Sequence, residues 1–421
     1  MKPATSSPIS LIFLHFFIIL FTTGCVNETE LFNTKADNLA YIKNNELATS
    51  RLTQIMFNQT DTENVMERFK IVHITDAHLS PWSSDNNYKY PKNLLEAVKF
   101  ANQGNLMINM LVSTGDCIHN DNKTSHEDAL RYLTSFADNI YNNNFIPTFA
   151  ITGNHDSNML TDDSKNIISK NDFFNTVTSE QNYSCENKGM QNYYYTDLPN
   201  PMGGVIRLIA LDVIDQVSST FDTQHYAVFS QEQIDWLCNE ALKNNLSEDH
   251  SVIVLVHHPF KPYIDSTNNY SINNEYMYSR EMIPEIIEAY RSKKKLQKEY
   301  KSSLNKGNII TVNTDFSSSS GEFVCYLSGH LHTTAILEVD GITNRNVNLP
   351  RQRMILSSNM SPSDNSTTYS LITRNANDIT NNSFNIYAID TKEKKVYITF
   401  FGAYKPSNKP DYSEIQVFNY L

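Results

Sequence analysis

Short apolar runs alternate with longer segments of helical period through the middle of the chain. The runs are rich in β-branched residues and end in polar residues, which is typical of buried strands. They lie at 70–75, 107–113, 148–151, 205–211, 251–256 and 323–328. Between them, apolar residues recur with the period of an amphipathic helix over 91–102, 126–141 and 231–243. Strands that alternate with helices predict a layered α/β fold.

Two segments interrupt this alternation. Residues 157–204 show no clear period and are expected to be irregular, and residues 261–320 form an insertion with a Tyr- and Asn-rich loop. Within the insertion we expect a helix over 282–300. Its basic run Arg291-Ser-Lys-Lys-Lys-Leu-Gln-Lys is either a phosphate- or membrane-binding patch or, as we expect, the solvated face of that helix. Further strands at 384–389 and 396–401 close the predicted folded domain, 68–403, and leave a C-terminal tail, 404–421.

The N-terminus has the pattern of an export signal. A signal peptide is predicted over 1–24, because Lys2 and a polar stretch precede the apolar run 11–21, which is too short to span a bilayer. It ends in Thr22-Thr23-Gly24-Cys25, which resembles the lipobox of bacterial lipoproteins, although Thr22 replaces the usual aliphatic residue. An ordinary cleaved signal peptide with an incidental Cys25 is the alternative.

The following residues, 25–67, are polar and predict a tether, with an amphipathic helix around 39–56. We therefore expect an exported protein of the cell envelope that is anchored in the membrane through lipid on Cys25. If Cys25 carries no lipid, the protein would be secreted or periplasmic.

Length and charge narrow the class of protein further. A chain of 421 residues allows one large α/β domain with insertions or two smaller domains. The 34 Lys and Arg against 46 Asp and Glu give a net charge of −12, which argues against a dedicated nucleic-acid surface. An anionic small substrate is still possible, since a bound metal reverses the charge inside a pocket. The five Cys are too few and too scattered for a disulfide framework. They include no CxxC pair, so neither a thiolate zinc site nor a redox motif is expected.

Polar residues that are able to bind metal follow five of the predicted strands. In chain order they are Asp76-x-His78, Gly115-Asp116, Gly153-Asn154-His155, His257-x-Pro259 and Gly329-His330-x-His332. The carboxyl ends of strands in a layered α/β fold converge on one crevice, and a glycine lets the backbone approach closely. Carboxylate, amide and imidazole ligands without thiolate suit Mn, Fe, Zn or Ni. The sequence therefore predicts a metal site at the strand ends.

This ordered set resembles the calcineurin-like metallophosphoesterase superfamily, whose pattern is D-x-H, G-D, G-N-H-D/E, H and G-H-x-H. The resemblance covers about residues 69–402. It implies a four-layer α/β/β/α sandwich with a dinuclear metal site at the strand ends. One ion would be bound by Asp76, His78 and His332, the other by Asn154, His257 and His330, and Asp116 would bridge both.

The resemblance also implies roles for residues beside the ligands. His155 would face the leaving group, and Asp156 would orient His155 through its ring N–H. His258 also precedes the proline, but the superfamily's ligand lies two residues before it, which favours His257. His119 is either a pocket residue or a plain loop histidine.

The implied activity is hydrolysis of phosphate esters by two divalent or trivalent metal ions. Ions roughly 3.5–4 Å apart clamp the attacking and leaving oxygens, and a water bridging them is acidified to a hydroxide that acts as nucleophile. Phosphomonoesters and phosphodiesters fit such a site equally well. The alternative from another class is a catalytically silent, envelope-anchored binding or adhesion protein on the same fold. It is disfavoured because a decayed enzyme loses ligands first, and here the whole set is present.

Overall fold

The computed structural model describes residue 50 and most of the chain from residue 67 onwards. Within 67–421 the described residues exclude 81–91, 120–122, 143, 159–163, 188–189, 216–226, 262–263, 266–269, 272–276, 278, 302–308, 340, 359, 361–381 and 404–414. The predicted signal peptide, the lipobox and nearly all of the predicted tether and its helix therefore lie outside the described residues. In the described part of the chain, no helix is both long enough and apolar enough to cross a membrane.

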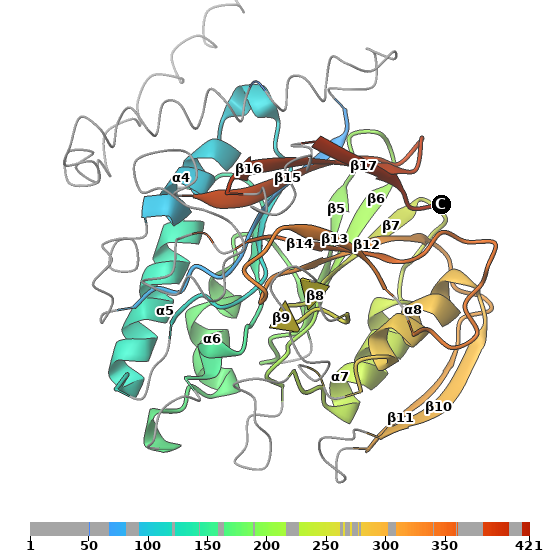
Figure 1. The fold of residues 1–421 in the computed structure, drawn as a ribbon, viewed down its shortest axis with the longest axis horizontal. Helices are drawn as coiled ribbons and strands as arrows, with labels where there is room; N and C mark the ends of the chain where they lie inside the picture. Colours follow the sequence, from blue (N-terminus) through green and yellow to red (C-terminus); the bar gives the residue numbers. More distant parts are fainter. Residues whose placement is uncertain are drawn as a thin grey trace, which may run out of the picture.

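Two β-sheets form the centre of the molecule (Figure 1). The first has the spatial order β17 (Ile415–Asn419), β16 (Lys395–Gly402), β15 (Ser383–Asp390), β1 (Phe69–Ile74), β2 (Met110–Ser113) and β3 (Thr148–Ala150). The second has the order β13 (Ala335–Glu338), β14 (Arg353–Leu356), β12 (Glu322–Ser328), β7 (His250–Leu255), β6 (Val205–Ala210), β5 (Tyr194–Pro199) and β4 (Glu186–Asn187). Strands β1, β2 and β3 are parallel, as are β6, β7, β12 and β14.

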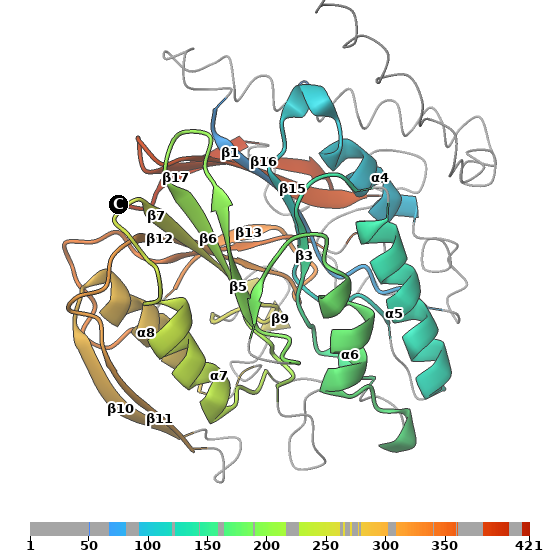
Figure 2. The same cartoon turned by 180° about the vertical axis from the view of Figure 1, so that it is seen from behind.

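Helices cover the outer face of each sheet (Figures 1 and 2). The first sheet is covered by α4 (Lys92–Ala101), α5 (His126–Tyr141) and α6 (Lys170–Thr176). The second is covered by α7 (Gln231–Trp236), which continues as a π-helical turn over Leu237–Ala241, and by α8 (Met282–Arg291) with the hairpin β10 (Lys295–Lys301) and β11 (Ile309–Asp315). Short elements complete the described chain: η1 (Gly104–Leu106), η2 (His155–Ser157), η3 (Ser164–Asn166), η4 (Thr178–Glu180), β8 (Ile264–Asp265) and β9 (Tyr270–Ser271).

The alternation of side chains along the strands builds these layers. In β1, Phe69 and Ile71 point into a cluster shared by both sheets, whereas Val72 and Ile74 pack under the helices of the first sheet. Both faces of β1 are therefore buried, which explains why its sequence is continuously apolar. The predicted four-layer α/β/β/α sandwich is confirmed.

Helix α5 matches its predicted bounds. Ser125 caps it by accepting a hydrogen bond from the backbone N–H of Asp128, and two acidic residues lie in its first turn, where they favour the helix dipole.

The predicted helix over 282–300 is wrong in its second half. Helix α8 ends at Arg291, Lys293 adopts a left-handed φ of 53°, and residues 295–301 pair with β11 as an antiparallel strand. Side chains along this strand point alternately towards and away from the second sheet. Tyr300 is buried in the hydrophobic cluster on the outer side of that sheet, while its neighbours point outwards. The basic run 291–298 therefore does not form the solvated face of one helix, because it is divided between the end of α8 and strand β10. The Arg291 guanidinium is buried 3.1 Å from Glu288, and the Lys298 ammonium lies 2.7 Å from Glu285.

Two further segments are more ordered than expected. Residues 157–204, predicted to be irregular, contain α6 and β5, and α6 begins with a capping box between Ser169 and Asp172. The predicted C-terminal tail contains β17, which pairs with β16 and forms the edge of the first sheet.

Candidate metal centre

The five polar strand ends meet at one place. Backbone hydrogen bonds tie them together: the Asp76 N–H donates to the Gly115 carbonyl at 2.9 Å, and the Gly329 N–H donates to the His257 carbonyl at 3.1 Å. The two sheets are joined at this edge, because the His330 N–H donates to Asp76 Oδ2 at 3.0 Å. The structure thus brings the predicted ligands of both sheets together, as the convergence of parallel strand ends requires.

One group of ligand atoms surrounds Asp76. Its Oδ1 lies 3.2 Å from His332 Nε2 and 3.7 Å from His78 Nε2, and the two imidazole nitrogens are 3.0 Å apart. Asp76 Oδ1 is buried and has no hydrogen-bond partner, and its other oxygen accepts a hydrogen bond from Thr75 Oγ1 at 2.6 Å. A buried, unpartnered carboxylate oxygen that faces two imidazole nitrogens is the donor chemistry of a cation site, so these residues fit a metal ion.

The second group surrounds Asn154. Its Oδ1 lies 3.1 Å from His257 Nε2 and 3.0 Å from His330 Nδ1. Asp116 joins the two groups, because its Oδ2 is 3.2 Å from His257 Nε2 and 3.8 Å from His78 Nε2. Asp116 thus lies between the two groups, with one carboxylate oxygen facing a histidine of each.

The charges within the centre stabilise one another. Burial opposes ionisation of Asp116, but the nearby imidazoles of His257 and His155 hold the pKa of its carboxyl far below the usual range. Burial lowers the pKa of His257, but the charge and hydrogen bond of Asp116 outweigh it and raise that pKa to about 9. The neighbouring imidazoles of His332 and His78 likewise outweigh burial and lower the pKa of Asp76 well below its ordinary value.

The backbone is strained at this centre. Non-glycine residues rarely adopt a positive φ, which costs roughly 1–2 kcal/mol per residue. Five of the seven predicted ligands do so: Asp76 at 52°, His78 at 48°, Asp116 at 52°, His330 at 70° and His332 at 48°. Such strain persists where the surrounding structure enforces it, and it concentrates at functional sites.

Two glycines allow the strand-end loops to touch. A Cβ on Gly153 would lie 2.2 Å from the Asp116 backbone nitrogen and 2.2 Å from its Oδ1. A Cβ on Gly329 would lie 2.0 Å from Thr75 Oγ1 and 2.5 Å from Asp76 Oδ2. Any larger residue at either position would push a predicted ligand away, which agrees with the close approach expected from the sequence.

His155 lies at the exposed side of the centre. Its side chain is 22% exposed, its ring centroid is 4.8 Å from that of His78, and its Nε2 is 4.0 Å from Asp116 Oδ2. Burial lowers its pKa well below the ordinary value, despite the Asp116 charge. His119 belongs to the same rim, since its ring stacks on that of His155 at 5.5 Å.

The role predicted for Asp156 is wrong. Its oxygens accept hydrogen bonds from three backbone N–H groups, Cys117 at 2.8 Å, Ile118 at 3.2 Å and Gly153 at 2.8 Å, and neither bonds the ring of His155. Asp156 therefore fastens the loop after β3 to the loop after β2 and positions the residues around it. Although Asp156 is next to His155 in sequence, its carboxylate accepts hydrogen bonds from the backbone N–H groups that the tertiary structure places beside it, because buried backbone donors need acceptors.

Asp212 was missed by the sequence analysis. It follows the apolar strand β6 as the ligands follow theirs, so its pattern was visible. Its Oδ1 accepts a hydrogen bond from Thr152 Oγ1 at 2.6 Å, two residues before Asn154. Burial raises the pKa of its carboxyl to about 6, and the nearby charge of Asp215 acts in the same direction. Asp212 thus supports the loop that carries Asn154 and His155.

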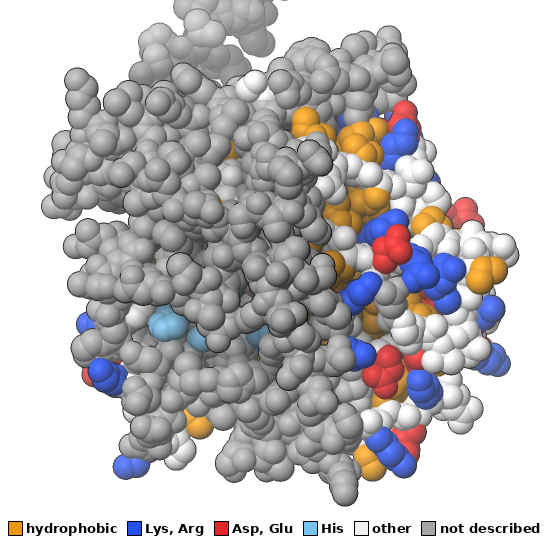
Figure 3. Space-filling view, in the orientation of Figure 1, with side chains coloured by type: hydrophobic (Ala, Val, Ile, Leu, Met, Phe, Trp, Pro, Cys, Tyr) orange, Lys and Arg blue, Asp and Glu red, His pale blue; other side chains and the backbone are white. Residues whose placement is uncertain are grey.

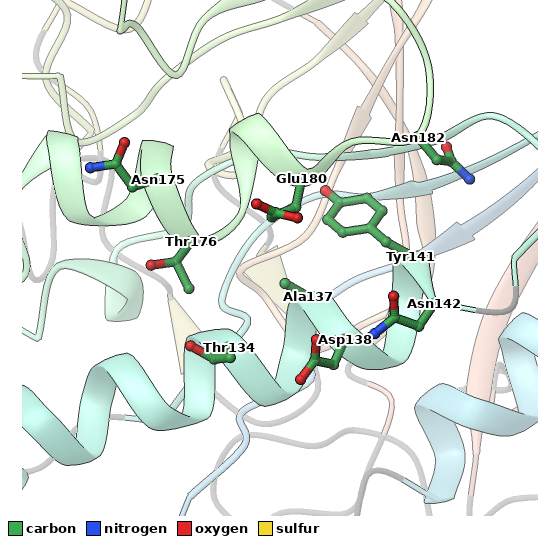
Figure 4. Close-up of a pocket in the computed structure, with 9 residues that line it drawn as sticks. All are labelled: Thr134, Ala137, Asp138, Tyr141, Asn142, Asn175, Thr176, Glu180 and Asn182. Carbon is green, nitrogen blue, oxygen red and sulfur yellow. Dashed lines mark hydrogen bonds between the residues drawn. The ribbon is translucent and has the colours of Figure 1, made fainter. Parts of the chain in front are cut away.

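One cavity lies apart from this centre. Histidine side chains reach the surface on the face shown in Figure 3. A cavity of about 410 Å³ lies elsewhere, between α5 and the segment from α6 to Asn182 (Figure 4). Its lining includes Asp138, Tyr141 and Glu180 but none of the predicted ligands, so it is separate from the metal centre.

The match to one protein family agrees with this geometry. A family model described as calcineurin-like phosphoesterase matches residues 69–334. No curated protein sequence matches the chain. A solved structure titled "Structure of PhoD" is similar at 11% sequence identity, with 84% of this chain and 70% of that chain covered and a TM-score of 0.43.

Proposed function

Because the chain belongs to the calcineurin-like phosphoesterase family, we propose that it hydrolyses phosphate esters with two metal ions held at the strand ends. The position of Asp116 carries this proposal. One oxygen of its carboxylate faces His257 at 3.2 Å in one group and His78 at 3.8 Å in the other. Two cations held close together repel each other, and an anionic bridge between them is the simplest way to hold both.

The remaining predicted ligands divide between the two ions. Asp76, His78 and His332 would hold one, and Asn154, His257 and His330 would hold the other. When bound, such ions polarise phosphoryl oxygens and lower the pKa of the water that attacks phosphorus. The donor set suits Mn, Fe, Zn or Ni. The carboxylates of Asp76 and Asp116 only half neutralise two divalent ions, so the loaded centre would attract an anionic ester.

His155 would act on the leaving group. Its ring lies on the exposed side of the centre, and its lowered pKa keeps the imidazole neutral at physiological pH. A neutral imidazole donates a hydrogen bond through one ring nitrogen, which would stabilise the negative charge that develops on the leaving oxygen. The His155 N–H donates to Asp116 Oδ1 at 2.9 Å, so its backbone is fixed relative to the centre.

The test is an assay of the metal-loaded full chain on a panel of phosphomonoesters, phosphodiesters and pyrophosphates. We expect hydrolysis of at least one class, loss of turnover on chelation and recovery when one of the named metals is added back. A protein that binds two metal ions per chain but hydrolyses none of these classes would support the alternative, a silent binding or adhesion protein. The pattern of turnover over the panel would identify the ester class.

We also propose that the enzyme acts outside the cytoplasm, anchored through lipid on Cys25. The support is the apolar run 11–21 followed by the lipobox-like Thr22-Thr23-Gly24-Cys25. The Cys25→Ser variant should move from the membrane fraction to the soluble fraction with unchanged turnover. A wild-type protein that is already soluble would contradict lipidation.

A further inference from the structure

His258 is a buried histidine of the centre to which no role has been assigned. Its side chain is fully buried, and its ring centroid lies 4.1 Å from that of His330 with an interplanar angle of 30°. The ring of His257 meets it edge-on at 5.1 Å and 81°. His258 therefore lies flat against one predicted ligand and follows another in the chain.

The ring of His258 contacts His330, a predicted ligand that lies in a loop and not in a strand. His330 lies in the loop after β12, outside the strand, with a left-handed φ of 70°. Its Nδ1 has to stay 3.0 Å from Asn154 Oδ1 for both to face one ion. A ring stacked against one face of the imidazole restricts rotation of that imidazole about its side-chain bonds. Ligands held by packed neighbours bind a metal at a lower entropic cost than free ones.

We propose that His258 is a positioning residue, whose ring holds the imidazole of His330 in the orientation that binds the second metal ion. The inference rests on the proposed function. Coordination makes an imidazole electron-poor, and the face of a neighbouring aromatic ring stabilises such a group. The family pattern favours His257 as the ligand, and the ring of the adjacent His258 stacks on the ligand His330.

A direct ligand role for His258 is the competing explanation. One ring nitrogen from each of His257, His258 and His330 lies within 4.8 Å of the others, which is close enough for three ligands. The two explanations predict different substitutions. Stacking requires an aromatic face, whereas ligation requires a ring nitrogen.

The experiment compares His258→Phe with His258→Leu in the full chain. Phe keeps an aromatic ring without a nitrogen, and Leu fills the space without a ring. Zinc affinity is measured by competition with a chromophoric chelator, metal content by elemental analysis, and melting temperature on the metal-free protein. Outer-shell substitutions typically cost about 10–100-fold in metal affinity, and we expect a loss of this size for one of the two ions in His258→Leu, with most of the affinity kept in His258→Phe. His250→Leu is the control, because His250 is buried at the opposite end of β7.

Each other outcome overturns the proposal. Equal losses in both variants would assign His258 as a direct ligand, and wild-type affinity in His258→Leu would make it a space-filling residue. If either variant does not fold, the other can still overturn the proposal, because a large loss of affinity in His258→Phe or wild-type affinity in His258→Leu contradicts it. A wild-type chain that binds no second ion would instead refute the proposed function, which separates the two failures.

Discussion

Replacing Gly153 by Ala tests the metal centre without removing any ligand atom. The added Cβ would lie 2.2 Å from the backbone nitrogen and from Oδ1 of Asp116, where ordinary contact begins at 3.4 Å. The Asp116 backbone cannot rotate away as a side chain would, so the loops after β2 and β3 have to separate by about 1.2 Å, which is the difference between those two distances. Asp116 Oδ2, now 3.2 Å from His257, would be displaced by a similar amount.

A misplacement of about 1 Å at reacting groups costs on the order of 100-fold in rate. We therefore expect Gly153→Ala to lose at least this factor in turnover of bis-nitrophenyl phosphate and to bind less than two metal ions per chain. Overpacking would also destabilise the fold by about 1–3 kcal/mol, so circular dichroism has to show that the variant is folded at the assay temperature. Gly104→Ala is the matched control, because its Cβ meets nothing within 4 Å. Turnover within a fewfold of the wild type, with two metals bound, would refute the reasoning.

Three further predictions address single residues. Asp116→Asn should lower the metal content from two ions per chain towards one and abolish hydrolysis while the fold survives, as measured by elemental analysis and turnover; two tightly held ions would show that Asp116 is not the bridge. His155→Ala should keep both ions and lose roughly 10²–10⁴ in turnover on esters with poor leaving groups but less on nitrophenyl esters, and equal losses on both would argue against proton or hydrogen-bond donation. The folded-state pKa of His257, about 9, lies above its ordinary 6.5, so its contribution to stability is full below pH 6.5 and is lost as pH rises towards 9. The metal-free protein should therefore lose at most about 3 kcal/mol of stability over this interval in thermal melts, with a flatter profile in Asp116→Asn; a flat wild-type profile would contradict the pairing.

Local pattern alone predicted a layered α/β fold and a meeting of the polar strand ends. The four-layer arrangement and the assignment of ligands to two ions came from the family resemblance. A strand such as β1, which is buried on both faces, has to be apolar throughout, and the polar residues that follow it therefore mark its carboxyl end. Parallel strands place those ends at one edge, so the sequence predicts that Asp76, Asp116 and Asn154 lie close together. The amphipathic helix 126–141 was equally predictable, because the period of its apolar residues is a local feature.

Tertiary contacts decided the rest. Residues 295–301 contain good helix formers, yet they form β10 because Tyr300 reaches the buried outer core only from a strand paired with β11. Asp156 bonds the amides of Cys117, Ile118 and Gly153 because two separate loops bring those donors to its carboxylate. The stacking of His258 on His330 joins residues 72 positions apart. The hydrophobic pattern of one segment encodes which of its faces is buried. It carries no information about which distant atoms that face will contact, and those contacts determine the roles of the residues around the ligands.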